Sequence, residues 1–98
     1  MEKTDLAVLD DIYETILERK RNPRNDSYVC SLLNHEKGFD RILEKIVEES
    51  AETIIAAKNG RTDEIVYESC DLLFHLMIML AEKDIKLNQL IDELKNRQ

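Results

Sequence analysis

Apolar residues recur at intervals of three and four along most of this chain, a spacing that places them on one face of an α-helix. The first such stretch follows Thr4, which can cap a helix, and continues to about Arg21. Pro23 and its polar neighbours then interrupt the pattern. Residues 27–33 are expected to form either a short helix or an ordered loop.

The periodicity resumes over residues 38–59 and predicts a second long helix, which ends where Gly60 gives a turn signal. Thr62 can cap a third helix. Over residues 65–81 this helix is apolar around most of its circumference, and a helix of that kind is buried on all sides. A last amphipathic helix is expected at about residues 87–97.

Strand-like alternation of useful length is missing, so the predicted fold class is all-α, a bundle of four to five helices. The 98 residues suffice for one domain, residues 1–98, with a modest core. A content of 43% hydrophobic and 36% charged residues agrees with such a helical domain. Because so small a chain cannot surround its third helix by itself, we expect a homodimer or a higher homo-oligomer.

Charge and composition narrow the function. A formal net charge of -7 argues against nucleic-acid binding, which depends on cationic contacts to phosphate. The longest apolar run, residues 72–81, is about half the roughly 20 residues of a membrane span, so no membrane partner is expected. Two distant cysteines and no signal-peptide pattern predict free thiols and a cytoplasmic location. Clustered cations in residues 19–24 either bind phosphate or complement a helix C-terminus.

Acidic residues form matched groups on the second and third helices. With 100° of rotation per residue, Glu49 falls inside the core-facing stripe of its helix, Glu52 flanks that stripe, and Glu48 points further out. Glu68 and Asp71 lie on the polar seam of the third helix. Because residues three apart share a helix face, two antiparallel helices should bring the four inward acids together, with Glu48 to the side.

Carboxylates removed from water are costly unless a cation or hydrogen bonds compensate them. Four oxygen donors without cysteine favour a hard divalent ion, Mg²⁺ or alternatively Mn²⁺. A di-iron centre would need Glu-x-x-His on two helices, which the position of His75 does not supply. Mg²⁺ keeps positions for water and substrate phosphates, so hydrolysis of a nucleotide phosphoanhydride fits the site. The opposing interpretation is that these acids are solvated helix faces or intersubunit salt bridges.

The segments around these acids resemble the phosphoribosyl-ATP pyrophosphohydrolases, which are all-α enzymes grouped with MazG-like proteins and dimeric dUTPases. The acidic pattern alone indicates only that superfamily, whereas the AAKN and DLLFHL runs point to the histidine-biosynthesis branch. In chain order the segments are Ser27-Tyr28, Leu32-Leu33, Lys45-Ile46-Val47-Glu48-Glu49-Ser50-Ala51-Glu52, Ala56-Ala57-Lys58-Asn59 and Glu68-Ser69-Cys70-Asp71-Leu72-Leu73-Phe74-His75-Leu76.

The resemblance implies a Mg²⁺-dependent homodimer that hydrolyses phosphoribosyl-ATP to phosphoribosyl-AMP and pyrophosphate, the second step of histidine biosynthesis. It implies four metal ligands, Glu49, Glu52, Glu68 and Asp71. Glu48 is a further candidate, for a second ion or for the attacking water, and we expect it to be the base. The alternatives are a MazG-like enzyme that acts on other nucleoside triphosphates and a non-catalytic helical dimer or partner-binding module.

The same resemblance implies that Lys45 and Lys58 lie near the polyphosphate and that Ser27 and Tyr28 bind substrate. Tyr28 either stacks on a base or packs the loop. His75 either hydrogen-bonds a ligand carboxylate from behind or is a core histidine whose polar atoms are satisfied.

Overall fold

The computed structural model describes residues 3–98, and within them the chain is all-α. Its elements are α1 (Ala7–Arg21), α2 (Tyr28–Leu33), α3 (Phe39–Asn59), α4 (Thr62–Glu82) and α5 (Leu87–Asn96). The prediction of an all-α chain is therefore confirmed, and the segment that was expected to be a short helix or a loop is helix α2. None of the helices in residues 3–98 combines the length and apolarity required to cross a bilayer.

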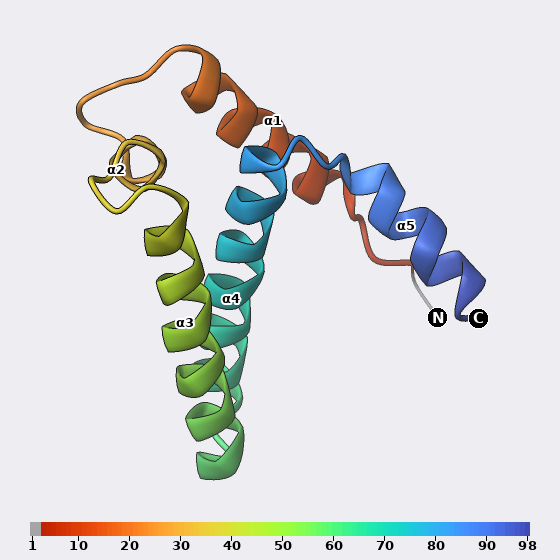
Figure 1. Ribbon diagram of the computed structural model, residues 1–98. Coiled ribbons are helices and arrows are strands. Elements are labelled where there is room, and N and C mark those ends of the chain that lie inside the picture. Colours follow the sequence, from red (N-terminus) through yellow and green to blue (C-terminus); the bar gives the residue numbers. More distant parts are fainter. Residues whose placement is uncertain (1–2) are drawn as a thin grey trace.

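Helices α3 and α4 form a long antiparallel hairpin that dominates the structure (Figure 1). Helices α1 and α2 cover one end of this hairpin, while α5 extends away from it on the α4 side. Gly60 makes the turn at the other end with a φ of +80°, a left-handed conformation that favours glycine. Its N–H donates to the main-chain oxygen of Ala56 at 3.1 Å, so the predicted turn closes the end of α3.

The helix caps differ from the prediction at two of the threonines. Thr4 does not cap α1: the helix begins at Ala7, whose N–H donates to the Asp5 carboxylate at 2.9 Å. Asp5 is closer to the first turn, and its charge suits a helix N-terminus. Thr62 is also not a cap. It is the first residue of α4, and Arg61 occupies the N-cap position.

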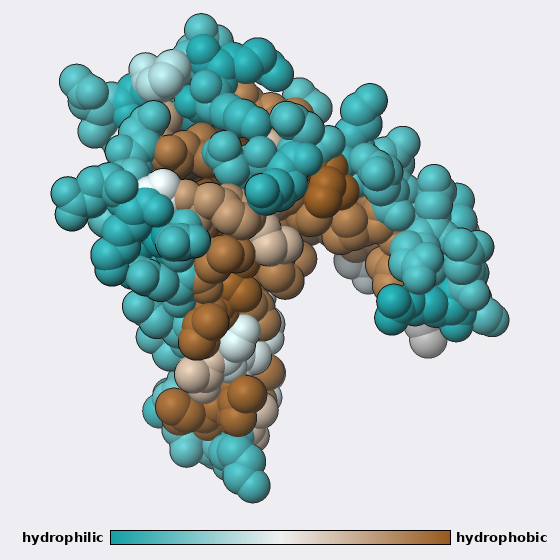
Figure 2. All heavy atoms as spheres, viewed as in Figure 1, coloured by the Kyte–Doolittle hydropathy of each residue, from teal (hydrophilic) through white to brown (hydrophobic). Residues whose placement is uncertain are grey.

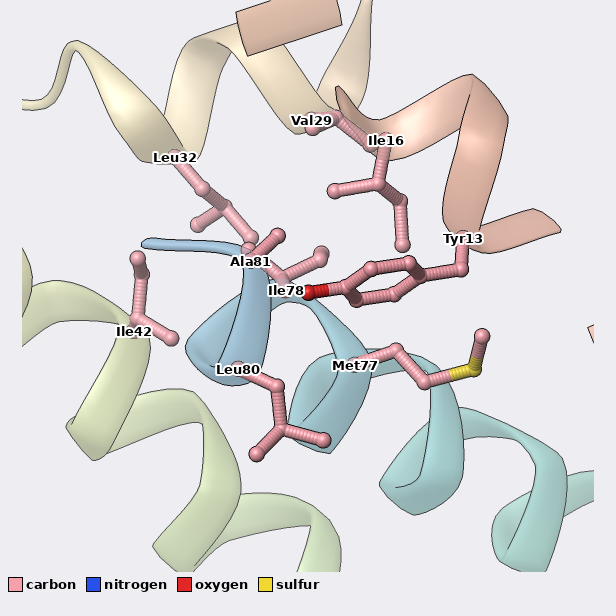
Figure 3. Packing of buried hydrophobic residues seen from close by; sticks show 9 residues of the cluster. All are labelled: Tyr13, Ile16, Val29, Leu32, Ile42, Met77, Ile78, Leu80 and Ala81. Atoms are coloured by element: carbon pink, nitrogen blue, oxygen red, sulfur yellow. The ribbon is translucent and has the colours of Figure 1, made fainter. Parts of the chain in front are cut away.

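The hydrophobic core lies where α1, α2 and the C-terminal half of α4 meet the start of α3 (Figure 3). Ile16, Ile42 and Ile78 come from three different helices, and each is at most 1% exposed. Full burial of an isoleucine side chain contributes roughly 1.5–3 kcal/mol. The Tyr13 hydroxyl donates to the main-chain oxygen of Ile85, which ties α1 to the segment before α5.

Lys20 and Arg24, from the clustered cations in residues 19–24, have structural partners. Lys20 donates to the main-chain oxygen of Ala81 at 3.1 Å and lies 3.2 Å from the Asp84 carboxylate. Arg24 pairs with Asp26 through two hydrogen bonds. The Lys20 contacts hold the C-terminus of α1 against the end of α4, in agreement with a role at the helix ends, whereas the Arg24 pair is local.

We expect Ile78→Ala to reduce the free energy of unfolding by about 2–5 kcal/mol, because it leaves a cavity between three helices. Ile78→Val should cost about 0.5–1.5 kcal/mol. Denaturant titration followed by circular dichroism measures both. Val8→Ala is the control, since Val8 is 53% exposed, and a loss as large as that of Ile78→Ala would contradict this location of the core.

Candidate active site

Three acids meet between α3 and α4 beyond the hydrophobic core. Glu49 of α3 and Glu68 and Asp71 of α4 each contribute a carboxylate oxygen, and these oxygens lie within 4.8 Å of one another. Glu49 is only 4% exposed, as its position within the apolar stripe predicted. The antiparallel packing of the two helices thus concentrates three negative charges at a half-enclosed point.

Two oxygens of this acid cluster, Glu49 Oε2 and Glu68 Oε2, are buried without a hydrogen-bond partner among the described residues. Buried polar atoms are normally satisfied, and an unpaired ionised oxygen is particularly costly. A cation that both oxygens could bind would remove this cost. Since the cluster offers only oxygen donors, its residues fit a hard divalent ion such as Mg²⁺ or Mn²⁺.

Thr53 holds the two helices together beside the cluster. Its hydroxyl lies 2.7 Å from the main-chain oxygen of Glu49 and 3.1 Å from that of Glu68. Ala56, one turn further along α3, is buried and small. Small side chains permit a close approach of helices, and the approach explains why acids on both helices reach one point.

Glu52 lies apart from the three clustered acids. It is exposed, and with Glu64 and Glu68 it borders a shallow hollow of about 180 Å³ nearer the turn. Three residues after Glu49, Glu52 is displaced by about 4.5 Å along α3 towards the turn and by about 60° around the helix. The structure therefore brings together three of the four inward acids, and Glu68 connects the cluster to the hollow that Glu52 borders.

Lys45 is the cation nearest the cluster. Its Nζ lies 3.2 Å from Glu49 Oε1 and 3.2 Å from Glu48 Oε2. Burial lowers the pKa of Lys45, but hydrogen bonds to Glu49 and then Glu48 outweigh that effect and the pKa is raised. Lys45 thus pairs with one oxygen of Glu49 only, and the other oxygen is buried without a partner.

Glu48 occupies the outer edge of the site, as the helical wheel predicted. Its side chain is 49% exposed and also lies 3.6 Å from the Arg41 guanidinium. The hydrogen bond from Lys45, with the charges of Lys45 and Arg41, lowers the pKa of this carboxyl despite the opposing effect of desolvation. Glu48 therefore stays ionised at neutral pH.

His75 links the site to α2. Its Nδ1 lies 2.7 Å from the main-chain oxygen of Asp71, and its Nε2 lies 2.7 Å from the Tyr28 hydroxyl. The imidazole is 3% exposed, and both ring nitrogens are engaged. His75 thus meets the main chain of Asp71 and not its carboxylate, which matches the interpretation as a satisfied core histidine.

The remaining residues from the family resemblance lie further away. Lys58 is exposed in the last turn of α3, about 20 Å along the helix axis from Lys45 at 1.5 Å per residue. Ser27 caps α2, since its hydroxyl accepts from the N–H of Cys30 at 3.2 Å. The structure thus brings Tyr28 and Lys45, but neither Lys58 nor the Ser27 hydroxyl, towards the acid cluster.

Arg41 and Thr53 are site residues that the sequence analysis missed. Arg41 stands four residues before Lys45, so the i, i+4 spacing could have placed it on the same helix face. Thr53 lies on the same narrow arc as Glu49, yet its contact with α4 could not be deduced without the packing of the two helices.

Comparison with known proteins agrees with this geometry. A sequence model of the phosphoribosyl-ATP pyrophosphohydrolase family matches residues 9–98. A "Phosphoribosyl-ATP pyrophosphatase" of Methanococcoides burtonii is 51% identical over 98 residues, which cover 100% of this chain and 99% of the relative. A protein of the same name from Methanosarcina barkeri is 52% identical over 97 residues, 99% of this chain and 93% of the relative.

A longer relative contains the same region. The "Histidine biosynthesis bifunctional protein HisIE" of Caldanaerobacter subterraneus is 49% identical over 92 residues, 94% of this chain but 44% of that protein. The family match thus covers most of the chain and includes every acid of the cluster. The chain belongs to the phosphoribosyl-ATP pyrophosphohydrolase family.

Proposed function

We propose that this protein hydrolyses phosphoribosyl-ATP to phosphoribosyl-AMP and pyrophosphate, the second step of histidine biosynthesis, with Mg²⁺ or alternatively Mn²⁺. The observation that carries the proposal is the buried acid cluster with its two unpaired oxygens in a chain of this family. Free cysteines at positions 30 and 70 support our placing the reaction in the cytoplasm.

Glu49, Glu68 and Asp71 would hold the divalent ion, and Glu52 would join them from the adjacent hollow. An ion bound there supplies positive charge that offsets the charge of the substrate phosphates. The unpaired oxygens of the cluster support this assignment, because they are the atoms with free ligand capacity.

Lys45 is the proposed phosphate-binding residue at the cluster. Its side chain is 20% exposed, and its ammonium is held by the carboxylates of Glu48 and Glu49. Tyr28, at the same edge, would contact the substrate. Lys58 and Ser27 keep their proposed substrate-binding roles at the turn end of α3 and at the start of α2, for parts of the substrate that lie away from the acid cluster.

We assign the catalytic roles to Glu48 and Glu49. Glu48 is ionised and half-exposed, so its carboxylate can accept a proton from an attacking water. The two cations that lower its pKa also limit its strength as a base. Glu49, fixed by Lys45 and by burial, orients the reacting groups.

The proposed assembly is a homodimer formed through the groove among α1, α4 and α5. This groove encloses about 570 Å³, and its lining is apolar except for Asp10. Brown, apolar surface runs along it in Figure 2. The groove is lined on the α5 side by Leu90, Ile91 and Leu94, which are 38–56% exposed.

A second copy of this chain fits the groove better than another occupant. Helix α5 has only ten residues, and a helix so short is marginal in water without packing on its apolar face. The described residues of the same chain leave that face open. Two-fold pairing would let each copy cover the apolar face of the other, as homodimers commonly do.

Glu49→Gln should lower pyrophosphate release from phosphoribosyl-ATP by more than about 100-fold. Loss of a residue that only hydrogen-bonds a metal ligand typically costs about 10–100-fold, and loss of the ligand itself should cost more. The melting temperature of the wild type should rise with added Mg²⁺, and that of the variant should not. Glu14→Gln on the exposed face of α1 is the control. Full turnover by Glu49→Gln would exclude its role.

A nucleotide panel separates this function from its rivals. The wild type should release pyrophosphate faster from phosphoribosyl-ATP than from ordinary or noncanonical nucleoside triphosphates. It should also restore growth without histidine to a strain that lacks the pyrophosphohydrolase step. Preference for another triphosphate would identify a MazG-like activity, and no release from any nucleotide would identify a non-catalytic dimer.

Lys45→Met should lower the free energy of unfolding by about 2 kcal/mol, because it leaves a buried carboxylate without its partner. Lys37→Met is the matched control: it removes an ion pair of the same 3.2 Å distance, with Glu44, at the surface. Chemical denaturation measures both variants. Equal losses would contradict the special position of Lys45.

Ile91→Glu should convert the dimer to a monomer, because it places a charge in the apolar groove. Gln89→Glu introduces the same residue on the opposite face of α5, outside the groove, and should leave the dimer intact. Sedimentation equilibrium gives the mass of each variant. A monomeric wild type, or a dimeric Ile91→Glu variant, would reject this interface.

A further inference from the structure

We propose that His75 is a positioning residue that fixes Tyr28 as a hydrogen-bond acceptor, so that Tyr28 binds a donor group of the nucleoside part of the substrate and not its phosphates. The inference rests on the proposed function for the identity of the substrate. The hydrogen bonds that carry it are observed in the structure and do not depend on that function.

The hydrogen bonds of His75 determine its tautomer. The main-chain oxygen of Asp71 can only accept, so Nδ1, at 2.7 Å, carries the proton and donates. In a neutral imidazole the other nitrogen, Nε2, then has a free lone pair. The Tyr28 hydroxyl lies 2.7 Å from that nitrogen and must donate its proton to it.

Tyr28 is left with acceptor capacity only. Its single hydroxyl proton is directed at His75, so the lone pairs of its oxygen are what a ligand can use. Phosphate oxygens are acceptors themselves and cannot bind there. Ribose hydroxyls and the amine of a base are donors, and they form the chemical class that this oxygen accepts.

The surroundings of Tyr28 place its phenol beside the acid cluster. The side chain is 49% exposed. Desolvation raises the pKa of Tyr28, while the charge of Lys45 opposes this and the charge of Glu49 adds to it. The phenol therefore lies within the electric field of both the proposed phosphate-binding cation and the buried acid.

Packing keeps this arrangement rigid. The His75 ring meets the Tyr28 ring edge to face, with centroids 5.7 Å apart, and the Phe74 ring in the same manner at 5.9 Å. Tyr28 is also the first residue of α2, whose N-terminus Ser27 caps. The α4 main chain holds the imidazole, the imidazole holds the phenol, and the capped helix holds the backbone of Tyr28.

Two amide variants of His75 separate this role from simple packing. The amide oxygen of glutamine reaches about as far as Nε2, so His75→Gln can still accept from Tyr28. The amide of asparagine reaches only as far as Nδ1, so His75→Asn keeps the bond to the Asp71 main chain and loses Tyr28. A purely structural role would affect both variants alike.

We expect Tyr28→Phe and His75→Asn each to raise KM for phosphoribosyl-ATP about fivefold, the effect of one neutral hydrogen bond, with kcat within about twofold of the wild type. His75→Gln should stay within about twofold in both constants. The double variant His75→Asn with Tyr28→Phe should be no worse than Tyr28→Phe, because both changes remove one interaction. Multiplied losses, or equal losses for Gln and Asn, would overturn the proposal.

Binding probes test the ligand class without turnover. Tyr28→Phe should weaken the affinity for AMP about fivefold and leave that for pyrophosphate unchanged. Comparison with 2′-deoxy-AMP and inosine monophosphate separates a ribose hydroxyl from a base amine as the donor. Loss of pyrophosphate affinity in Tyr28→Phe would overturn the proposal.

Nitrogen NMR of the wild type should show His75 protonated on Nδ1. The His75→Asn variant, which lacks the imidazole, assigns the signal. Protonation on Nε2 alone would overturn the proposal. A wild type that binds AMP as expected but does not hydrolyse phosphoribosyl-ATP would reject the proposed function and leave this inference standing.

Discussion

The burial of Glu49 is the constraint on which the site depends. A carboxylate that is 4% exposed needs compensation, and Lys45, one turn earlier on the same helix, provides it for one oxygen only. The second oxygen is buried without a partner, and the nearby carboxylates of Glu68 and Asp71 increase the cost. A chain that folds with this cluster accepts a local loss of stability, which is common where a site must bind a ligand.

The fold meets this cost by separating the core from the site. Ile16, Ile42 and Ile78 pack at the end of the hairpin that α1 and α2 cover. The acids lie further along α3 and α4, where Thr53 joins the two helices through the main chain of Glu68. The packed core at one end thus offsets the cost of the acid cluster in the middle of the hairpin. Helix α2 connects the two regions, because it carries the core residue Leu32 and also Tyr28.

The sequence was sufficient to predict the four longer helices, because apolar spacing and the Gly60 turn are local signals, but it left α2 open between a short helix and a loop. It also placed Glu49 inside the apolar stripe. The cap at Thr4 was wrong because a nearby acid, Asp5, competes for the same N–H group. Such competition between neighbours depends on which residue actually starts the helix, and that varies by one or two positions.

Long-range contacts set the limit of prediction at the site. The bond between Tyr28 and His75 joins residues 47 positions apart, and spacing within one helix cannot reveal it. The separate position of Glu52 follows from its rotation relative to α4, which requires the angle and distance between the helices. The exposed position of Lys58 depends on how far α3 extends past the site, so a match to a family motif alone could not place it.

The apolar surface of α4 connects assembly with chemistry. Met77, Ile78 and Ala81 are buried by the chain's own core, which explains the apolar character of the C-terminal half. Leu73 lies in the open groove and remains 45% exposed, two residues from Asp71. Covering this groove with a second copy would remove water from the back of the helix that carries two of the acids. Since charge interactions strengthen as water is excluded, assembly would then tighten the hold of the cluster on a cation.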